Sequence, residues 1–429
     1  MKPVLLNTYD QIGGAARAAY RLHRGLRRVG IDSQLLVQRK TSDDPTVHGP
    51  EGRVGKAIAR ARPFLDSIPL WAYRGRPDGL FSPGLLPDRM ARRIAALGGD
   101  LLHLHWVAGG FLNPATLAKL DRPIVWTLHD SWAFTGGCHV PGTCTRYREA
   151  CGACPALGSR REHDLSRGLL DRKRRAWARS VPAIVTPSRW LADAARASAL
   201  LRDASIEVIP NGLDLARFKP FDRDAARDFL GLPRDRSLLL FGGVGSMSDR
   251  NKGFPILVDA LARLSRKAEG RGAELVVVGQ SRPEPPPALA VPARFVGPLA
   301  DEESMALYQA AADALVLPSL QENHPNMVIE AMACGTPTVA FRAAGLPDLV
   351  DHQVTGFLAE PYQGEDLARG IAWVLEDETR RRRLGETARR RAERDHDIEA
   401  VARRYRATYE RLLAGTGPGR GGAGRPRSW

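Results

Sequence analysis

The 429-residue sequence has no run of about 18 consecutive apolar residues, and this absence argues against a membrane-spanning helix. Its first residues, MKPVLLNTYD, turn polar after a short apolar stretch, so they do not have the pattern of a secretory signal peptide. We therefore expect a cytoplasmic location. With 43% apolar and 26% charged residues, the composition is typical of a globular protein.

Residues 206–429 carry no net charge, because their basic and acidic residues are equal in number. Residues 1–205 contain 32 Lys and Arg against 17 Asp and Glu, so this half carries the entire net charge of +15. A basic half implies an anionic partner, such as a phosphate-bearing acceptor, an anionic membrane surface or nucleic acid. The arginines are spread over helices and loops without a recognised nucleic-acid-binding module, so we expect no nucleic-acid partner.

Short apolar runs alternate with stretches of helical periodicity in both halves, which predicts parallel sheets covered by helices on both faces. We expect strands at residues 4–6, 34–37, 101–105, 124–129, 183–186 and 206–209, and in the second half at 237–241, 275–278, 314–317 and 338–340. The clearest helices of the second half are expected at 254–267, 302–311 and 326–334.

The turn signal Pro210-Asn211-Gly212 follows a predicted strand and divides the two halves. We therefore predict two Rossmann-like domains, an N-terminal one at 1–209 and a C-terminal one at 210–396. A terminal helix at 397–414 is expected to pack back towards the N-terminal domain. The final segment, 415–429, contains six Gly, two Pro and three Arg, and we expect it to be disordered.

Residues 53–77 interrupt the alternating pattern with Trp, Phe, Tyr and aliphatic residues among basic ones. One interpretation is an amphipathic segment that seeks a membrane interface, and the other is a helical insertion packed on the domain. Pro63 and Pro69 are expected to break any single long helix in this segment.

The stretch QENHPNMVIEAMACGTP at 321–337 follows a predicted strand and opens a helix. The free N–H groups of its first turn, at Asn326, Met327 and Val328, form an anion site suited to a diphosphate. Glu330 lies one turn further along the same helix face and can accept both hydroxyls of a ribose. Glu322 precedes the helix and can reach a sugar ring instead.

Glu322 and Glu330 are separated by seven residues, and in this context they resemble the Glu-x7-Glu motif of the retaining family-4 glycosyltransferases. The resemblance extends over most of the chain, through the glycine loop GGAAR at 13–17, HLHW at 103–106, VWTLHD at 125–130, EVIPNGLD at 207–214 and NKGF at 251–254. The two stretches that contain histidine resemble a bacterial polysaccharide-assembly branch, of the colanic-acid type, within that family.

The resemblance implies the GT-B fold, in which two Rossmann-like domains face each other across a cleft. Gly13 and Gly14 would approach the donor phosphates, and Lys252 would neutralise the departing diphosphate. His129 would contact the donor sugar at the reacting face.

Relatives place an arginine several residues before this lysine, and Arg250 is the residue available for that role here. Base contacts are expected from the stretch 294–297, including Val296.

We expect no metal cofactor for catalysis. The Asp-x-Asp sequences at 222–224 and 395–397 precede helical runs and are interpreted as helix N-caps. Lys252 and the helix starts would stabilise the diphosphate without Mg²⁺. No side chain is an evident nucleophile, so we expect front-face attack, with the leaving diphosphate taking the acceptor proton.

The remaining motif is a group of four cysteines within seventeen residues, Cys138, Cys144, Cys151 and Cys154. In a cytoplasmic protein such a group suggests a structural Zn²⁺ site more than disulfides. Only one C-x2-C pair is present, so free or redox-paired thiols remain the alternative.

These features predict a hexosyltransferase that moves a sugar from a UDP- or GDP-sugar to a glycan or a polyprenyl-diphosphate-linked acceptor in cell-surface polysaccharide synthesis. The basic half would dock peripherally on the anionic inner face of the plasma membrane. The alternative on the same fold is a sugar-nucleotide epimerase. The one-sided positive charge argues against it, because an epimerase needs no macromolecular acceptor.

Overall fold

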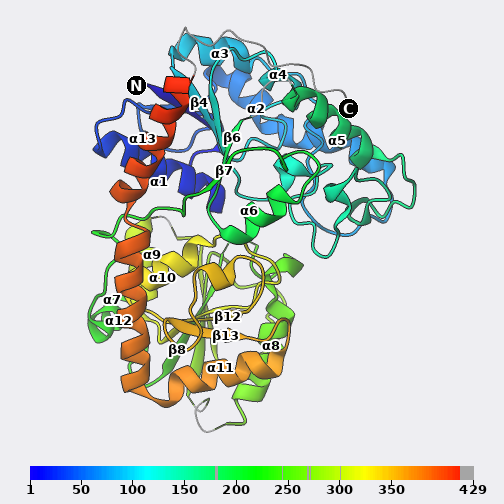
Figure 1. The fold of residues 1–429 in the computed structure, drawn as a ribbon. Helices are drawn as coiled ribbons and strands as arrows, with labels where there is room; N and C mark the ends of the chain where they lie inside the picture. The colour runs from blue at the N-terminus through cyan, green and yellow to red at the C-terminus, as the bar shows by residue number, and fades with distance from the viewer. Residues whose placement is uncertain (179–181, 244, 268–269, 271, 300, 416–429) are drawn as a thin grey trace.

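The computed structural model describes residues 1–178, 182–243, 245–267, 270, 272–299 and 301–415 (Figure 1). The N-terminal domain contains a parallel sheet in the order β3-β2-β1-β4-β5-β6-β7. Its strands are β1 (Pro3–Tyr9), β2 (Gln34–Arg39), β3 (Val47–His48), β4 (Leu101–Leu104), β5 (Ile124–Thr127), β6 (Ala183–Thr186) and β7 (Ile206–Val208).

The C-terminal domain contains a second parallel sheet, in the order β10-β9-β8-β11-β12-β13. Its strands are β8 (Ser237–Gly242), β9 (Ala273–Val278), β10 (Ala293–Gly297), β11 (Ala314–Leu317), β12 (Thr338–Phe341) and β13 (Gly356–Ala359). The predicted α/β fold with two Rossmann-like domains is therefore confirmed.

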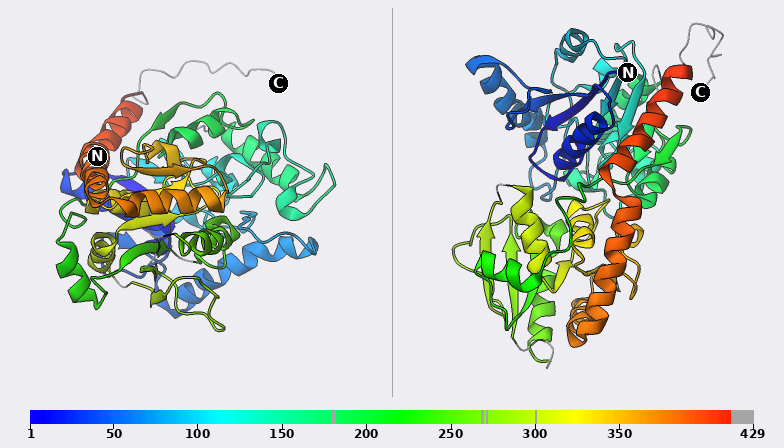
Figure 2. Two further views of the ribbon diagram at one scale, coloured as in Figure 1. Left: turned by 90° about the horizontal axis from the view of Figure 1, so that it is seen from below. Right: turned by 90° about the vertical axis from the view of Figure 1, so that its left-hand side faces the viewer.

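Helices cover both faces of each sheet (Figures 1 and 2). Those of the N-terminal domain are α1 (Gly14–Arg28), α2 (Gly52–Ser67), η1 (Ile68–Ala72), α3 (Met90–Leu97), α4 (Pro114–Leu117), η2 (Trp132–Phe134), η3 (Arg146–Arg148), η4 (Pro155–Leu157), α5 (Leu165–Trp177) and α6 (Arg189–Arg196). Those that follow are α7 (Arg223–Leu230), η5 (Arg250–Lys252), α8 (Phe254–Leu264), α9 (Glu302–Ala311), α10 (Asn326–Cys334), η7 (Leu346–Asp348), α11 (Gly364–Glu376), α12 (Glu378–Asp395) and α13 (Ile398–Gly415).

The strands are continuous apolar runs because both of their faces are buried. In β1, Val4 and Leu6 pack in the core on one face of the sheet, whereas Leu5 packs in the core on the other face. The sheet of the C-terminal domain is likewise buried between two cores, which contain Leu240 and Leu239 respectively. Alternation along each strand thus builds a three-layer domain in each half.

The chain crosses between the domains twice, and the two crossing segments hydrogen-bond to each other. The N–H of Leu213 donates to the carbonyl of His396 (2.7 Å), and the N–H of Ile398 donates to the carbonyl of Leu213 (3.0 Å). After the second crossing, α13 packs against α1 of the N-terminal domain (Figures 1 and 2). There the Tyr409 hydroxyl contacts Nδ1 of buried His103 (2.6 Å).

Some elements differ from the sequence-based expectation. Pro63 lies inside α2, which runs on to Ser67, so the prediction that this proline breaks the helix is wrong. Arg62 beside it donates to the carbonyls of Gly110 and Pro87, which holds this turn of the helix on the domain. Residues 416–429 lie outside the described residues. In the described part of the chain, no helix combines the length and the apolarity needed to cross a membrane.

Candidate functional site

The starts of two helices from different domains meet at the boundary between the domains. Helix α1 follows β1, and α10 follows β11, so both begin at carboxyl ends of parallel strands. Gly13 caps α1 with a φ of 91°, a conformation that glycine adopts without strain. The Asn326 side-chain amide, at the start of α10, donates to the carbonyl of Gly14 (2.9 Å). The free N–H groups of both first turns therefore lie close to one boundary region, where they favour an anion.

Lys252 and Glu322 form an ion pair beside the start of α10, with 2.7 Å between Nζ and Oε1. Gly253 follows the lysine with a φ of 69°, and a Cβ at this position would collide with the carbonyl of Pro318. Burial alone would lower the pKa of Lys252, but the Glu322 carboxylate outweighs it and holds that pKa above the usual 10.5. The lysine is therefore charged at neutral pH and remains partly exposed to a ligand.

Asn323 connects this loop to the opposite domain, a role that no sequence motif assigned to it. Its side-chain amide donates to the carbonyls of Leu128 (3.3 Å) and His129 (3.1 Å), and its Oδ1 accepts from the Ser188 hydroxyl (2.5 Å). The only feature of the sequence that could have pointed to Asn323 is its place between Glu322 and the start of the helix. These bonds place the end of β5, and with it His129, against the loop that holds Glu322.

His129 is neutral at neutral pH, because burial lowers its pKa to about 4. Its Nε2 lies 3.0 Å from Nδ1 of His105, and Nε2 of His105 is buried without a partner among the described residues. A proton on that orphaned nitrogen would be an unsatisfied donor, so we assign the His105 proton to Nδ1, which donates to His129. His129 then carries its own proton on Nδ1 and can donate it to a ligand oxygen.

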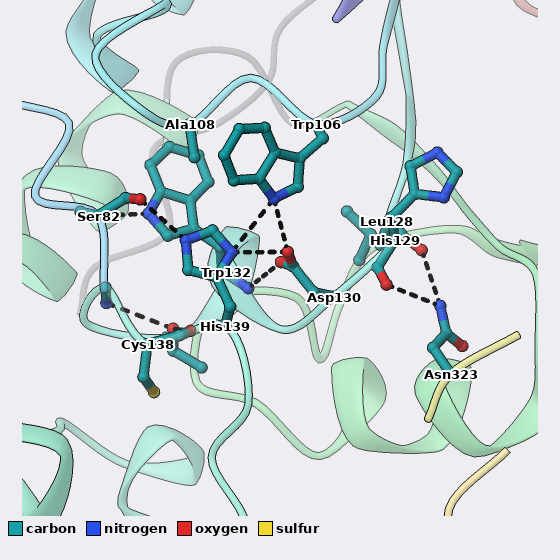
Figure 3. A network of polar contacts seen from close by, with 12 residues as sticks. Ser82, Trp106, Ala108, Leu128, His129, Asp130, Trp132, Cys138, His139 and Asn323 are labelled. Carbon is teal, nitrogen blue, oxygen red and sulfur yellow. Dashed lines mark hydrogen bonds and ion pairs between the residues drawn. The ribbon is translucent and has the colours of Figure 1, made fainter. Parts of the chain in front are cut away.

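Asp130 anchors the loop that follows His129 (Figure 3). Its Oδ2 accepts from the Trp106 indole (2.8 Å) and lies 2.6 Å from Nδ1 of His139, whose Nε2 contacts the Ser82 hydroxyl (2.9 Å). Burial raises the pKa of Asp130, but His139 and the hydrogen bonds from Trp132 and Trp106 together outweigh it, so this carboxyl has a lowered pKa. Figure 3 shows the ring of His129 turned away from this network, which leaves that ring free of the loop anchor.

Glu330, predicted to bind a ribose, is 1% exposed and forms an ion pair with Arg21 of α1. Nη2 of Arg21 lies 2.7 Å from Oε1 of Glu330, and its Nε lies 2.7 Å from Oε1 of Glu302. Among the described residues, Nη1 of Arg21 and Oε2 of Glu330 have no partner. In this arrangement of the domains the Glu330 carboxylate is paired with Arg21, and its role in binding a ribose stays a prediction. No motif in the sequence singled out Arg21.

The other predicted donor-binding residues are spread along the carboxyl edge of the second sheet. Val328 is buried in the first turn of α10, and Met327 beside it is partly buried. Val296 lies at the end of β10, where the N–H of Gly279 donates to the carbonyl of Gly297 (2.8 Å). Arg250 is exposed at the start of η5. The roles of these residues stay predictions.

All four clustered cysteines, Cys138, Cys144, Cys151 and Cys154, line one small cavity, and each has a free thiol. Burial raises the pKa of Cys138 to about 12 and that of Cys151 to about 11. With the side chains as they stand, no group of His, Cys, Asp and Glu in the described ranges is arranged to hold a metal ion. The fold thus places the four thiols around one cavity, but their side chains are not positioned to coordinate a metal ion.

A larger cavity, of about 480 Å³, lies outside the predicted site. Its lining includes Asp214, Arg217, Phe221 and Leu307. This cavity contributes no residue to the predicted site. The groups available for chemistry at the domain boundary are the helix starts and the Lys252–Glu322 pair. Together these groups can bind a diphosphate and stabilise negative charge that develops on it.

Two family models match consecutive parts of the chain. Residues 12–217 match the model described as Glycosyltransferase Family 4, and residues 222–391 match the model described as Glycosyl transferases group 1. The two matches correspond closely to the two domains of the structure.

Two similar proteins from bacteria are both named D-inositol 3-phosphate glycosyltransferase. That of Jonesia denitrificans is 26% identical over 428 residues, which cover 94% of this chain and 93% of that protein. That of Saccharomonospora viridis is 35% identical over 204 residues, 44% of this chain and 46% of that protein. At this higher identity the chain spans about half the length of the curated relatives that it matches. The expected polysaccharide-assembly branch is not confirmed by these names.

Solved structures share the fold over nearly the whole chain. Sucrose-phosphate synthase from Thermosynechococcus elongatus superposes with a TM-score of 0.70 at 22% identity and covers 97% of this chain and 100% of its own. The HepE protein of Anabaena in complex with UDP-glucose has a TM-score of 0.61 at 19% identity and covers 96% of this chain and 100% of its own. At such identities the likeness shows the fold alone. Taken with the two family matches, each of which covers slightly less than half of the chain, it shows that the chain has the GT-B fold and that both of its halves resemble glycosyltransferase families.

Proposed function

We propose that the protein transfers a hexosyl group from a nucleoside-diphosphate sugar to an acceptor hydroxyl, with retention at the anomeric carbon. The observation that carries this proposal is the Lys252–Glu322 pair at the start of α10, held opposite His129 by the amide of Asn323. A cation, a helix start and a neutral imidazole donor at one boundary suit a diphosphate that is linked to a sugar.

The donor would lie along the carboxyl edge of the second sheet. Its diphosphate would accept from the first N–H groups of α10 and from Lys252, and its base would lie near Val296. The HepE structure contains UDP-glucose, which makes a UDP-sugar the first donor to test and a GDP-sugar the second.

The bond changes of the proposed reaction need no protein nucleophile. The acceptor oxygen forms a bond to the anomeric carbon on the face from which the diphosphate oxygen departs, and the acceptor proton passes to that oxygen. Lys252 would stabilise the charge that grows on the departing diphosphate. Glu322 would keep Lys252 in place and contact the sugar, and His129 would donate to a sugar hydroxyl.

The acceptor is proposed to carry phosphate, since the net positive charge of the chain lies entirely in its N-terminal half. Two classes satisfy this condition. One is a glycan on a polyprenyl diphosphate, used in cell-surface polysaccharide synthesis. The other is a phosphorylated inositol, which the names of the relatives favour.

A polyprenyl-linked acceptor would require docking on an anionic membrane, and α2 with η1 has the surface for it. Its exposed large apolar side chains are Val54, Ile58, Phe64, Leu65, Ile68 and Trp71, and the exposed basic residues Arg53, Lys56, Arg60 and Arg74 lie among them. Helix α2 extends along the outside of the N-terminal domain (Figure 2).

We expect sedimentation with anionic but not neutral vesicles, reversed by salt, because salt screens such attraction within about 10 Å. Equal binding to both vesicle types would remove the electrostatic argument. The absence of binding to either would favour the soluble, inositol-type acceptor.

A thermal-shift panel of UDP-, GDP- and ADP-sugars tests the donor proposal, since the true donor raises the melting temperature by mass action. The variant Glu330→Ala tests the proposed ribose contact. We expect it to weaken nucleotide binding by about 1–3 kcal/mol because the ribose hydroxyls lose a charged acceptor. NMR analysis of the product then separates transfer from epimerisation: a free epimer formed without acceptor would refute the transferase assignment.

A further inference from the structure

The four cysteines outside the proposed reaction surround a space that fits a single ion. Cys138, Cys144, Cys151 and Cys154 come from a loop that follows β5, yet all four line one cavity of about 10 Å³. A volume of this size accommodates about one water-sized sphere. The cavity is therefore matched to one atom rather than to an organic ligand.

Backbone donors lie near two of these sulfurs. The N–H of Gly136 lowers the pKa of Cys151, and the N–H groups of Ala156 and Leu157 lower that of Cys154, although the Leu157 N–H donates to the carbonyl of Cys154 (3.1 Å). A neutral thiol is a weak acceptor and gains little from such donors, whereas a thiolate gains a charge-assisted hydrogen bond from each. Burial outweighs these donors and keeps the pKa of Cys151 and of Cys154 raised, so the thiols stay protonated until a cation replaces their protons.

A buried cation also lies next to the cluster. Lys173 on α5 is 1% exposed, and its Nζ donates to the carbonyls of Trp132 and Thr135 and lies 3.9 Å from the centre of the Trp132 ring. Within the described part of the chain, no carboxylate forms an ion pair with it. Burial lowers the pKa of Lys173 to about 7, although Cys138, Cys151 and Asp130 act to raise it. A buried ammonium without a carboxylate partner is costly unless negative charge develops close by.

The backbone at the C-x2-C pair is held in an uncommon conformation. Cys151, Gly152 and Ala153 all have positive φ, at 55°, 93° and 40°. For a cysteine and an alanine this conformation is strained, and it persists where the surroundings or a ligand enforce it. Here it turns the chain so that Cys151 and Cys154 both face the cavity.

We propose that Cys138, Cys144, Cys151 and Cys154 bind one structural zinc ion in this cavity. On binding, the four thiols lose their protons to water, and the resulting tetrathiolate site has a net charge of −2 that Lys173 partly compensates. The thiols line the cavity without yet meeting at one centre, so binding turns them inward, which for cysteine is a rotation about a single side-chain bond. Four sulfurs then surround the ion tetrahedrally, as in structural zinc sites.

The ion would join the loop to both sides of the boundary between the domains. His139, next to Cys138, contacts Asp130 directly after His129. The N–H of Gly142, close to Cys144, donates to Oε1 of Gln321 in the C-terminal domain (3.1 Å). Zinc would therefore hold the loop in the conformation that supports His129 and that touches the residue before Glu322. This role is structural and independent of the proposed transfer reaction.

Elemental analysis of untagged full-length protein tests the proposal directly. We expect about one equivalent of zinc, lost in Cys138→Ser and Cys151→Ser. Cys334→Ser is the matched control, because Cys334 is buried on α10, its Sγ contacts the carbonyl of Ala306 at 3.6 Å, and it lies outside the cluster. The control should keep its zinc. Protein without metal, or zinc retained in both cluster variants, would overturn the assignment.

Two further measurements do not depend on how well the variants fold. Cobalt added to chelated wild-type protein should give the thiolate charge-transfer and d–d bands of a tetrahedral tetrathiolate site, and five thiols should titrate in the chelated, unfolded protein. Fewer than five thiols would indicate a disulfide and refute the zinc site.

The variant Lys173→Met tests the role of the buried lysine. It should lower zinc affinity by about 10- to 100-fold while keeping the cobalt spectrum, as expected for a neighbour that tunes the ligands. Unchanged affinity would remove Lys173 from the proposal.

Discussion

Lys252 and Glu322 compensate each other's charge in the absence of a ligand, at 2.7 Å and with only partial exposure. A diphosphate that enters beside them adds a second anionic partner for the lysine, and that partner gains charge as the sugar–oxygen bond breaks. The lysine therefore interacts more strongly with the transition state than with the bound donor. Such a residue contributes to turnover more than to affinity.

We expect Lys252→Ala to lower kcat by about 10²–10³, with a smaller change in donor affinity, because its partner charge grows in the transition state. Steady-state kinetics with the identified donor, together with calorimetry of nucleotide binding, separates the two effects. Lys267→Ala, just beyond the far end of the same helix α8, is the control and should match the wild type. Equal losses in affinity and in kcat/KM, with kcat unchanged, would contradict the proposed role.

At the scale of elements, α1 and α10 are joined across the boundary by the buried pair of Arg21 and Glu330. Burial alone would lower the pKa of Arg21, but Glu330 and Glu302 outweigh it, so the guanidinium has a raised pKa and stays charged. Removing one partner of a buried pair leaves an uncompensated charge that must be hydrated. If a ribose binds Glu330 as proposed, it would have to replace Arg21, so donor binding and the contact between the domains would compete for one carboxylate.

We expect Arg21→Ala to tighten nucleotide binding, by a factor within the range of about 5–150 that is typical of coupled sites, because the competing cation is gone. Small-angle scattering of the donor-free variant should also show a larger radius of gyration. Arg28→Ala is the matched control: Arg28 lies on the same helix and pairs with Asp214 across the boundary (2.5 Å), but it does not touch Glu330. Weaker nucleotide binding in Arg21→Ala would indicate instead that Arg21 contacts the donor.

The whole molecule carries several histidines that folding keeps neutral. Burial lowers the pKa of His23, His129 and His396 to about 4 and that of His103 to about 3. A folded pKa below the unfolded value of 6.5 means that the unfolded chain binds more protons in this range. The stabilisation is therefore complete above pH 6.5 and is lost as the pH falls towards 4.

We predict that the free energy of unfolding falls by about 1.4 kcal/mol per pH unit for each such histidine below pH 6.5. Urea unfolding at pH 7.5, 6.5 and 5.5 measures the slope, above the range where most carboxyls titrate. His23→Gln should reduce this slope by the contribution of one group, since a glutamine can replace both its contacts, to Ser33 and Thr46, without a charge. A free energy that stays constant from pH 6.5 to 5.5 would refute the account.

Local signals in the sequence were sufficient for most of the fold. The apolar runs at β1, β8 and β11 predicted strands buried on both faces, and the helix start at Asn326 was predicted at the residue where it occurs. They failed at β3, β10 and β13, which were not predicted as strands. An edge strand such as β10 has partly exposed residues and lacks the continuous apolar run of a central strand.

The sequence by itself determined the two domains, the helix starts and the residue types at the boundary, because these depend on periodicity, glycine conformation and spacing within a few residues. Only the tertiary structure decided which of these residues meet. Arg21 and Glu330 are 309 residues apart in the chain, and Asn323 lies 194 residues from His129. The four cysteines likewise acquire a shared cavity and a buried neighbour, Lys173, only when α5 packs against their loop. Contacts of this kind depend on how the layers of the fold pack, so they cannot be predicted from local sequence patterns.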